Sequence, residues 1–117
     1  MTAREHISVS EVGDISVVRF TDRKIIDAGR IAGMGDELFT LVEQENRKSL
    51  LLNFTDVEFL SSAALNKLII LDKKVKAAGG KLKLSNLRPE IEEVFVITRL
   101  NQLFEIKEDE AEALAAF

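Results

Sequence analysis

The chain contains no cysteine and only one histidine. Without cysteine it can form neither a disulfide framework nor a thiolate metal site, which favours a reducing cytoplasmic compartment. No apolar stretch approaches the roughly 20 residues that a membrane-spanning helix needs. The segment that follows Met1 also lacks the apolar run of a signal peptide. We therefore expect a cytoplasmic protein without membrane insertion.

Basic residues are also fewer than acidic ones. Sixteen basic residues face twenty acidic ones, which gives a net charge of −4, and the basic residues form no cluster. This balance argues against nucleic acid as a partner. A chain of 117 residues, 46% of them hydrophobic, is long enough for one domain with its own core but too short for two. We expect residues 1–117 to form a single domain.

The sequence shows no catalytic constellation. His6 lies near the terminus and is expected to be a surface residue rather than a general base or a metal ligand. The segment Gly29–Gly35 holds three glycines but lacks the Gly-Lys-Ser/Thr ending of a phosphate-binding loop, so the glycines indicate either close packing or a mobile surface. Asp56 and Glu58 have no partner acid, base or metal cluster, so a solvated loop is expected. These absences predict a protein that is not an enzyme, with no cofactor and no metal site.

Hydrophobic periodicity divides the chain into strands that alternate with helices. A hairpin is expected within the first twenty residues, with its turn at Gly13 and Asp14, and a short extended piece at residues 25–26. Further strands are expected at 50–52, 82–84 and 103–106, the second of them half exposed or near an edge. Helices are expected at 28–46, with Asp27 as the cap just before it, and at 62–78, 89–98 and 108–117. The order strand, strand, helix, strand, helix, strand, helix, strand, helix predicts an α/β fold. It should contain a mixed sheet of four to five strands and about four helices.

The stretch Asn53–Leu65 connects the most apolar run of the sequence to the second long helix. Ser61 is expected to cap that helix, a contribution of roughly 1 kcal/mol, and Ser62 to be its first residue. A phosphate on a serine at this position would meet free N–H groups and the positive end of the helix dipole. Helix physics alone favours serines that serve only the helix end, although the same geometry would tolerate a phosphate.

In this stretch the sequence resembles the STAS domain, the fold of bacterial anti-sigma factor antagonists and of the cytoplasmic tail of sulphate transporters. The family motif Asp-Ser-Ser/Thr-Gly-Leu opens the second helix and reads Ser-Ser-Ala-Ala-Leu here, at residues 61–65. Residues 79–84 and 89–100 are similar to later segments of the family, so the resemblance covers nearly the whole chain. It implies that the phosphoacceptor serine is Ser62, with Ser61 less favoured. Ser61 replaces the aspartate of the motif, and Ala64 replaces its glycine.

The resemblance further implies a regulatory role. An antagonist of this family binds, while unphosphorylated, an anti-sigma factor with serine kinase activity and so releases a sigma factor. Phosphorylation at Ser62 would switch it off, and a PP2C-type phosphatase would reset it. We expect a monomer or weak dimer whose partner-binding residues are Asp27, Asp56, Glu58, Ser61, Ser62, Ala63 and Ala64. The alternative is an unphosphorylated STAS scaffold, or a subunit of a larger signalling or transporter-associated assembly, in which both serines serve only the helix end.

Overall fold

A five-stranded mixed sheet forms the centre of the molecule, with strand order β1-β2-β4-β6-β7. The computed structural model describes residues 4–117; residues 1–3, which the expected single domain includes, lie outside that range. The first two strands are antiparallel and the remaining neighbours are parallel. The strands are β1 (Ile7–Val12), β2 (Ile15–Phe20), β4 (Ser49–Asn53), β6 (Lys81–Ser85) and β7 (Glu105–Lys107). The predicted α/β class and mixed sheet are confirmed.

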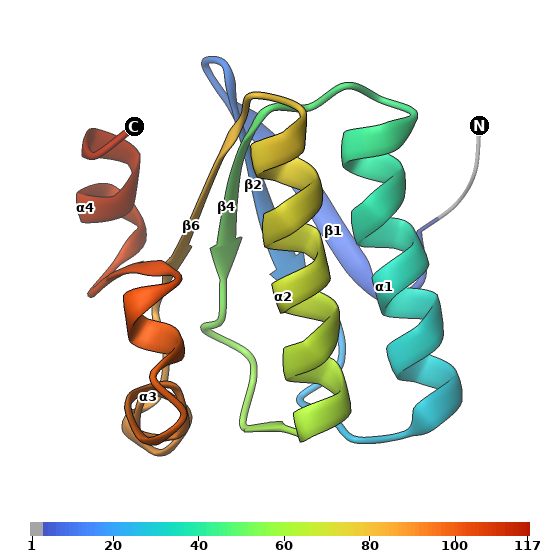
Figure 1. The fold of residues 1–117 in the computed structure, drawn as a ribbon, viewed down its shortest axis with the longest axis vertical. Helices are drawn as coiled ribbons and strands as arrows, with labels where there is room; N and C mark the ends of the chain where they lie inside the picture. Colours follow the sequence, from blue (N-terminus) through green and yellow to red (C-terminus); the bar gives the residue numbers. More distant parts are fainter. Residues whose placement is uncertain (1–3) are drawn as a thin grey trace.

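Two long helices, α1 (Ala28–Glu43) and α2 (Ser62–Ala77), run side by side over one face of this sheet (Figure 1). Two shorter helices follow, α3 (Pro89–Ile97) and α4 (Glu110–Ala115), with the 3-10 turn η1 (Leu100–Gln102) after α3. A separate parallel ribbon pairs β3 (Lys24–Ile25) with β5 (Phe59–Leu60). Helix α1 ends three residues before the predicted end, and β5 is an element that the sequence pattern did not predict.

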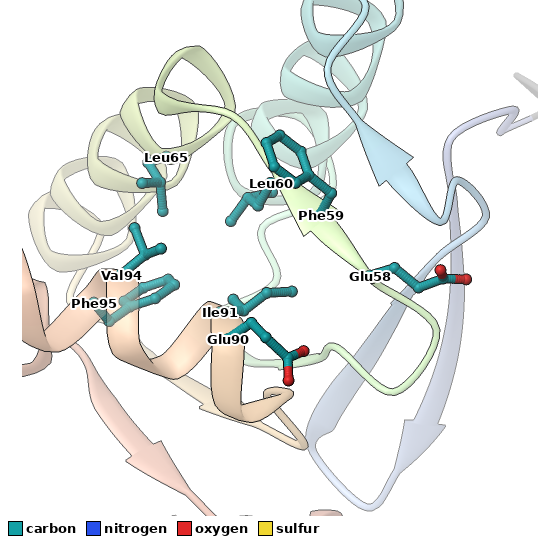
Figure 2. Close-up of a pocket in the computed structure, with 8 residues that line it drawn as sticks. All are labelled: Glu58, Phe59, Leu60, Leu65, Glu90, Ile91, Val94 and Phe95. Atoms are coloured by element: carbon teal, nitrogen blue, oxygen red, sulfur yellow. The ribbon is translucent and has the colours of Figure 1, made fainter.

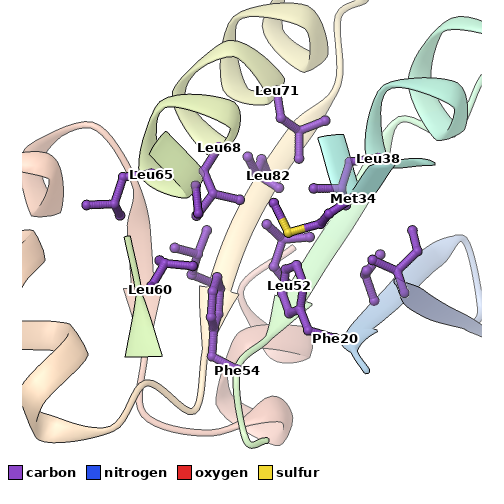
Figure 3. Close-up of a cluster of buried hydrophobic side chains, with 14 of the residues drawn as sticks. Phe20, Met34, Leu38, Leu52, Phe54, Leu60, Leu65, Leu68, Leu71 and Leu82 are labelled. Atoms are coloured by element: carbon purple, nitrogen blue, oxygen red, sulfur yellow. The ribbon is translucent and has the colours of Figure 1, made fainter. Parts of the chain in front are cut away.

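The core lies between the sheet and the two long helices. Leu50 and Leu52 face this core, where the rings of Phe20 and Phe54 lie 4.9 Å apart and Leu68 of α2 is fully buried (Figure 3). The intervening strand residue, Leu51, points to the opposite face and packs against Ala113 of α4. A strand without polar alternation is thus covered on both faces, as expected for parallel strands inside a sheet.

Strand β6 is not at an edge, contrary to prediction. It pairs with both β4 and β7, and Lys83 at its centre is only 8% exposed. The lysine side chain crosses toward the exposed carboxylate of Glu105, with which it forms an ion pair, and its ammonium group lies 5.1 Å from the ring of Phe117. A long side chain can cover apolar surface while its charged end stays paired, so the alternation of lysine and leucine was a misleading edge signal.

His6 is likewise buried rather than a surface residue. Its ring lies against α1 at Gly33, where a Cβ atom would stand 2.5 Å from Nε2. The backbone N–H of His6 donates to the Glu37 carboxylate at 3.0 Å, and Nδ1 lies 3.5 Å from Asp22. Gly33 therefore permits close packing of α1 on the start of β1, which decides between the two interpretations of the glycines at this position.

Candidate functional site

The first turn of α2 separates the two adjacent serines into different environments. Ser61 has extended backbone angles, and its Oγ accepts a hydrogen bond from the Ala64 N–H at 3.3 Å, so it is the N-cap as predicted. Ser62 is the first helical residue, and its side chain is exposed. The hydroxyl of Ser62 is therefore open to solvent while the cap is already formed by its neighbour.

The β3–β5 ribbon fixes where this turn sits. Ile25 lies opposite Leu60 in the parallel register, and the Ser61 N–H donates to the Ile25 carbonyl at 3.1 Å. Asp27 follows two residues later and caps α1, where its Oδ2 accepts from the Arg30 N–H at 3.0 Å. Because β3 precedes α1 and β5 precedes α2, the pairing of these strands places the N-termini of both long helices at the same end of the molecule (Figure 1).

The positive ends of these two helices differ in charge, because α1 is capped by the carboxylate of Asp27 whereas α2 is capped by the neutral hydroxyl of Ser61. The first turns of α1 and α2 contain no aspartate or glutamate, whereas α3 and α4 each have two glutamates in theirs. The first N–H groups of an α-helix have no acceptor within the helix, and the aligned peptide dipoles place partial positive charge there. An anion at Ser62 would therefore meet favourable backbone electrostatics without a carboxylate in the same turn.

Two predicted partner-binding carboxylates belong to the loop between β4 and β5. The loop is anchored by Asn53, whose side-chain oxygen accepts from the Thr55 N–H at 2.9 Å, and by the buried side chain of Val57. Asp56 is exposed at the turn, while Glu58 is half buried and lies 3.4 Å from the guanidinium of Arg23. The structure thus leaves Asp56 free to meet a partner and assigns Glu58 a salt bridge across the ribbon.

Ala64, which was predicted to bind a partner, is buried in the structure. Ala63 is exposed beside Ser62, but Ala64 is fully buried in the main core. It lies one helical turn before Leu68, on the core-facing stripe of α2. Its methyl group cannot contact a partner, so Ala64 does not belong to the exposed surface.

Two exposed apolar residues flank the serines, and the sequence pattern did not select them. Ile26 is 52% exposed beside Asp27, and Phe59 is 53% exposed in β5. Each belongs to an adjacent apolar pair in extended backbone, Ile25 with Ile26 and Phe59 with Leu60. Successive side chains of an extended chain point to opposite sides, so one member of each pair must face outward, and this was the available signal.

An ion-pair cluster braces the start of α1. Arg30 donates to the two carboxylate oxygens of Asp22 at 3.0 and 2.5 Å. These hydrogen bonds hold the pKa of the Asp22 carboxyl below its ordinary value. Because Asp22 precedes β3 and Arg30 lies in the first turn of α1, the cluster ties the ribbon to the helix.

Metal-binding groups and membrane-spanning helices are both absent from the described part of the chain. Between residues 4 and 117, no group of three or more histidine, cysteine, aspartate or glutamate side chains could hold a metal ion. Over the same residues, no helix combines the length and the apolar character needed to cross a bilayer.

Comparison with known proteins places this architecture among relatives. The family model for the STAS domain matches residues 6–113. BtrV of Bordetella bronchiseptica, named as a candidate anti-sigma factor antagonist, is 26% identical over 93 residues, which are 80% of this chain and 79% of the relative.

Solved structures share the fold at lower identity. An anti-sigma-factor antagonist (STAS) domain protein from Planctomyces limnophilus superposes with a TM-score of 0.84 at 19% identity, covering 94% of this chain and 96% of that one. The Bacillus cell fate determinant SpoIIAA in its phosphorylated form gives a TM-score of 0.71 at 19% identity, with 94% and 97% covered. With the family model matching almost the whole chain, the protein belongs to the STAS domain family.

Proposed function

We propose that this chain is an anti-sigma factor antagonist whose binding is switched by phosphorylation at Ser62. Its family membership and the named role of its relatives support the general function. The observation that supports the switch is that the two serines at the start of α2 differ in role: Ser61 forms the cap, and Ser62 remains exposed. The modifiable hydroxyl is thus not one that the fold requires.

The chemistry of the switch is a phosphoryl transfer from ATP. The Ser62 Oγ attacks the γ-phosphorus and its proton passes to a base of the kinase, while the bond to the β-γ bridging oxygen breaks and its electron pair leaves with ADP. The product carries about −1.5 to −2 charges at neutral pH. The N-terminal end of α2 would stabilise this charge. The domain should therefore stay folded while the surface around Ser62 changes from neutral to strongly anionic.

The unphosphorylated surface would bind an anti-sigma factor with serine kinase activity, and so release a sigma factor. Around Ser62 it combines exposed apolar side chains with carboxylates, a composition typical of a protein interface rather than of a catalytic cleft. Its proposed members are Ile26, Asp27, Asp56, Glu58, Phe59, Ser61, Ser62 and Ala63.

A phosphate at the centre of this interface must be desolvated and would face carboxylates on the same surface. A penalty of about 1 to 3 kcal/mol, roughly 5- to 150-fold in affinity, is enough for regulation. A PP2C-type phosphatase would restore binding by hydrolysing the phosphoester. The protein itself would act as a non-catalytic cytoplasmic binding partner, as a monomer or weak dimer.

The test uses purified anti-sigma factors with kinase-type ATP-binding domains from the source organism. Each is incubated with the protein and ATP, and the modified residue is located by mass spectrometry. We expect phosphate on Ser62 in the wild type and in Ser61→Ala, and none in Ser62→Ala. Calorimetry should show tight binding of Ser62→Ala and weakened binding of Ser62→Asp. If a kinase binds the protein but leaves Ser62 unmodified, the switch is wrong and the binding role stands.

A further inference from the structure

A pocket of about 160 Å³ opens between β5, α2 and α3 (Figure 2). Four side chains with little exposure form its apolar wall: Leu60, Leu65, Ile91 and Phe95. The more exposed Phe59 and Val94 complete the lining, together with the two carboxylates of Glu58 and Glu90. The interior of the pocket is therefore apolar, and two carboxylates lie at its rim.

The size of the pocket limits what can enter it. A cavity of about 150 Å³ lined by aliphatic and aromatic side chains accommodates a benzene ring. One leucine, methionine or phenylalanine side chain fits such a volume, whereas a nucleotide or other large cofactor does not. The occupant is thus one apolar group rather than an extended ligand.

Charge at the rim indicates what lies beside that group. Figure 2 places Glu58 and Glu90 toward the same end of the pocket, with Val94 and Leu65 toward the other. Over residues 4–117, Glu90 takes part in no ion pair, and the partner of Glu58 is Arg23, whose side chain is 78% exposed and can swing away. Cations next to the apolar group would be complementary to these carboxylates.

The apolar surface also continues outside the pocket. Phe59 is 53% exposed and Val94 is 37% exposed, so apolar atoms extend beyond the mouth on two elements. A ligand of benzene size would leave this rim uncovered, while a protein segment lying across the mouth would cover it. The occupant that fits volume, rim and charge together is a side chain belonging to a larger partner.

We propose that this pocket receives one leucine, methionine or phenylalanine side chain of a protein partner, flanked by lysine or arginine. The pocket shares β5 with the proposed switch, because Leu60 is followed directly by Ser61, and Leu65 belongs to the first turns of α2. The identity of the partner as an anti-sigma factor rests on the proposed function. The recognition chemistry does not, so the two can be tested separately.

The first experiment needs no partner. The amide-capped peptides Lys-Phe-Arg and Glu-Phe-Glu are titrated into the ¹⁵N-labelled protein and followed by amide chemical shifts in NMR spectra. We expect the basic peptide to shift the amides of Leu60, Leu65, Ile91 and Phe95 and to bind about fivefold or more tightly than the acidic one, because two exposed charge pairs favour it. Shifts confined to other regions, or equal affinity of both peptides, would overturn the assignment.

Matched variants on α3 provide the control. Val94→Arg blocks the mouth and repels the flanking cation, and we expect it to weaken the basic peptide about tenfold or more. Val96→Arg adds the same charge on the same helix, at a residue that does not line the pocket, and should change affinity less than about twofold. Glu90→Lys and Glu93→Lys form a second pair of the same design. Equal effects within either pair would contradict the proposal.

The second experiment uses an anti-sigma factor that binds the wild-type protein. Val94→Arg should weaken this complex about tenfold, and Val96→Arg should not. If the complex forms and Val94→Arg leaves it unchanged, the pocket assignment is wrong while the antagonist function stands. If no anti-sigma factor binds but the basic peptide occupies the pocket, the antagonist function is wrong and the pocket assignment stands.

Discussion

Replacing each of the two adjacent serines in turn with alanine should separate the contribution to stability from the contribution to regulation. Ser61→Ala removes the side-chain oxygen that accepts from the Ala64 N–H, whereas Ser62→Ala removes an exposed hydroxyl at the first helical position. We expect the first change to destabilise the fold and leave Ser62 available to a kinase. The second should leave stability nearly unchanged and abolish phosphorylation.

Two features of the cap set the size of the effect. The bond of 3.3 Å is slightly longer than the usual N–H···O range, which argues for the lower part of the range of about 0.5 to 2 kcal/mol measured for lost caps. Ala64 is fully buried, however, so its N–H would be left without an acceptor in a place that water reaches poorly. These opposing effects predict a loss of about 1 kcal/mol for Ser61→Ala, or about 4 °C in melting temperature for a chain of this length. Ser62→Ala should change the unfolding free energy by less than about 0.5 kcal/mol, since alanine is the best helix former.

Urea unfolding followed by far-ultraviolet circular dichroism measures both effects. The midpoint of Ser61→Ala should fall while the slope stays that of the wild type. Ser61→Asp is the matched control, because a carboxylate also caps helices well and should restore the midpoint. Equal losses in Ser61→Ala and Ser62→Ala would refute this difference in role between the two serines. It would mean that Ser62 is structural, and an absence of phosphorylation in Ser62→Ala would then say nothing about a switch.

Two further predictions concern glycines and acid stability. A Cβ atom at Gly80 would overlap the backbone carbonyl of Lys48, while at Gly79 it would meet open space, although φ there is +77°. Thermal unfolding should therefore show a larger loss for Gly80→Ala than the roughly 1 to 2 kcal/mol expected for left-handed backbone in Gly79→Ala, and the opposite order would contradict the close approach of Gly80 to Lys48. The hydrogen bonds from Arg30 lower the pKa of Asp22, so this carboxylate stabilises the fold above its ordinary pKa and loses that contribution as the pH falls below it. Asp22→Asn should then show a shallower loss of unfolding free energy than the wild type between about pH 5 and pH 2, and an unchanged slope would exclude the pair as a source of acid sensitivity.

Features that depend on nearby residues could be read from the sequence. Asp27 and Ser61 were expected at helix starts because a cap needs only a short polar side chain and the N–H groups that follow it. The run Leu50–Leu52 was expected inside a sheet because it has no polar alternation, and it is buried on both faces. Interactions within a few residues leave a clear pattern in the sequence.

Features that depend on distant partners could not be predicted in this way. Strand β5 has two residues and pairs with β3 across more than 30 residues of chain, so no periodicity marks it. The burial of His6 requires a missing side chain at Gly33, which a sequence pattern does not connect to residue 6. The burial of Ala64 could have been predicted, since this residue stands four positions before Leu68 on the core-facing stripe of α2. The family motif instead led to the prediction that Ala64 contacts a partner.

Three residues depart from the family motif, Ser61, Ala63 and Ala64, and none of them adds a charge beside Ser62. Ser61 stands where the motif has aspartate and caps the helix with a neutral oxygen. Ala64 stands where the motif has glycine, and its methyl group is directed into the core, so it adds nothing to the surface that a kinase would approach at Ser62. The main difference is electrostatic, because the residue beside the acceptor carries no charge. A phosphate at Ser62 would therefore meet less repulsion from its nearest neighbour than in proteins with the aspartate, and its destabilising influence should fall on the partner complex rather than on the folded domain.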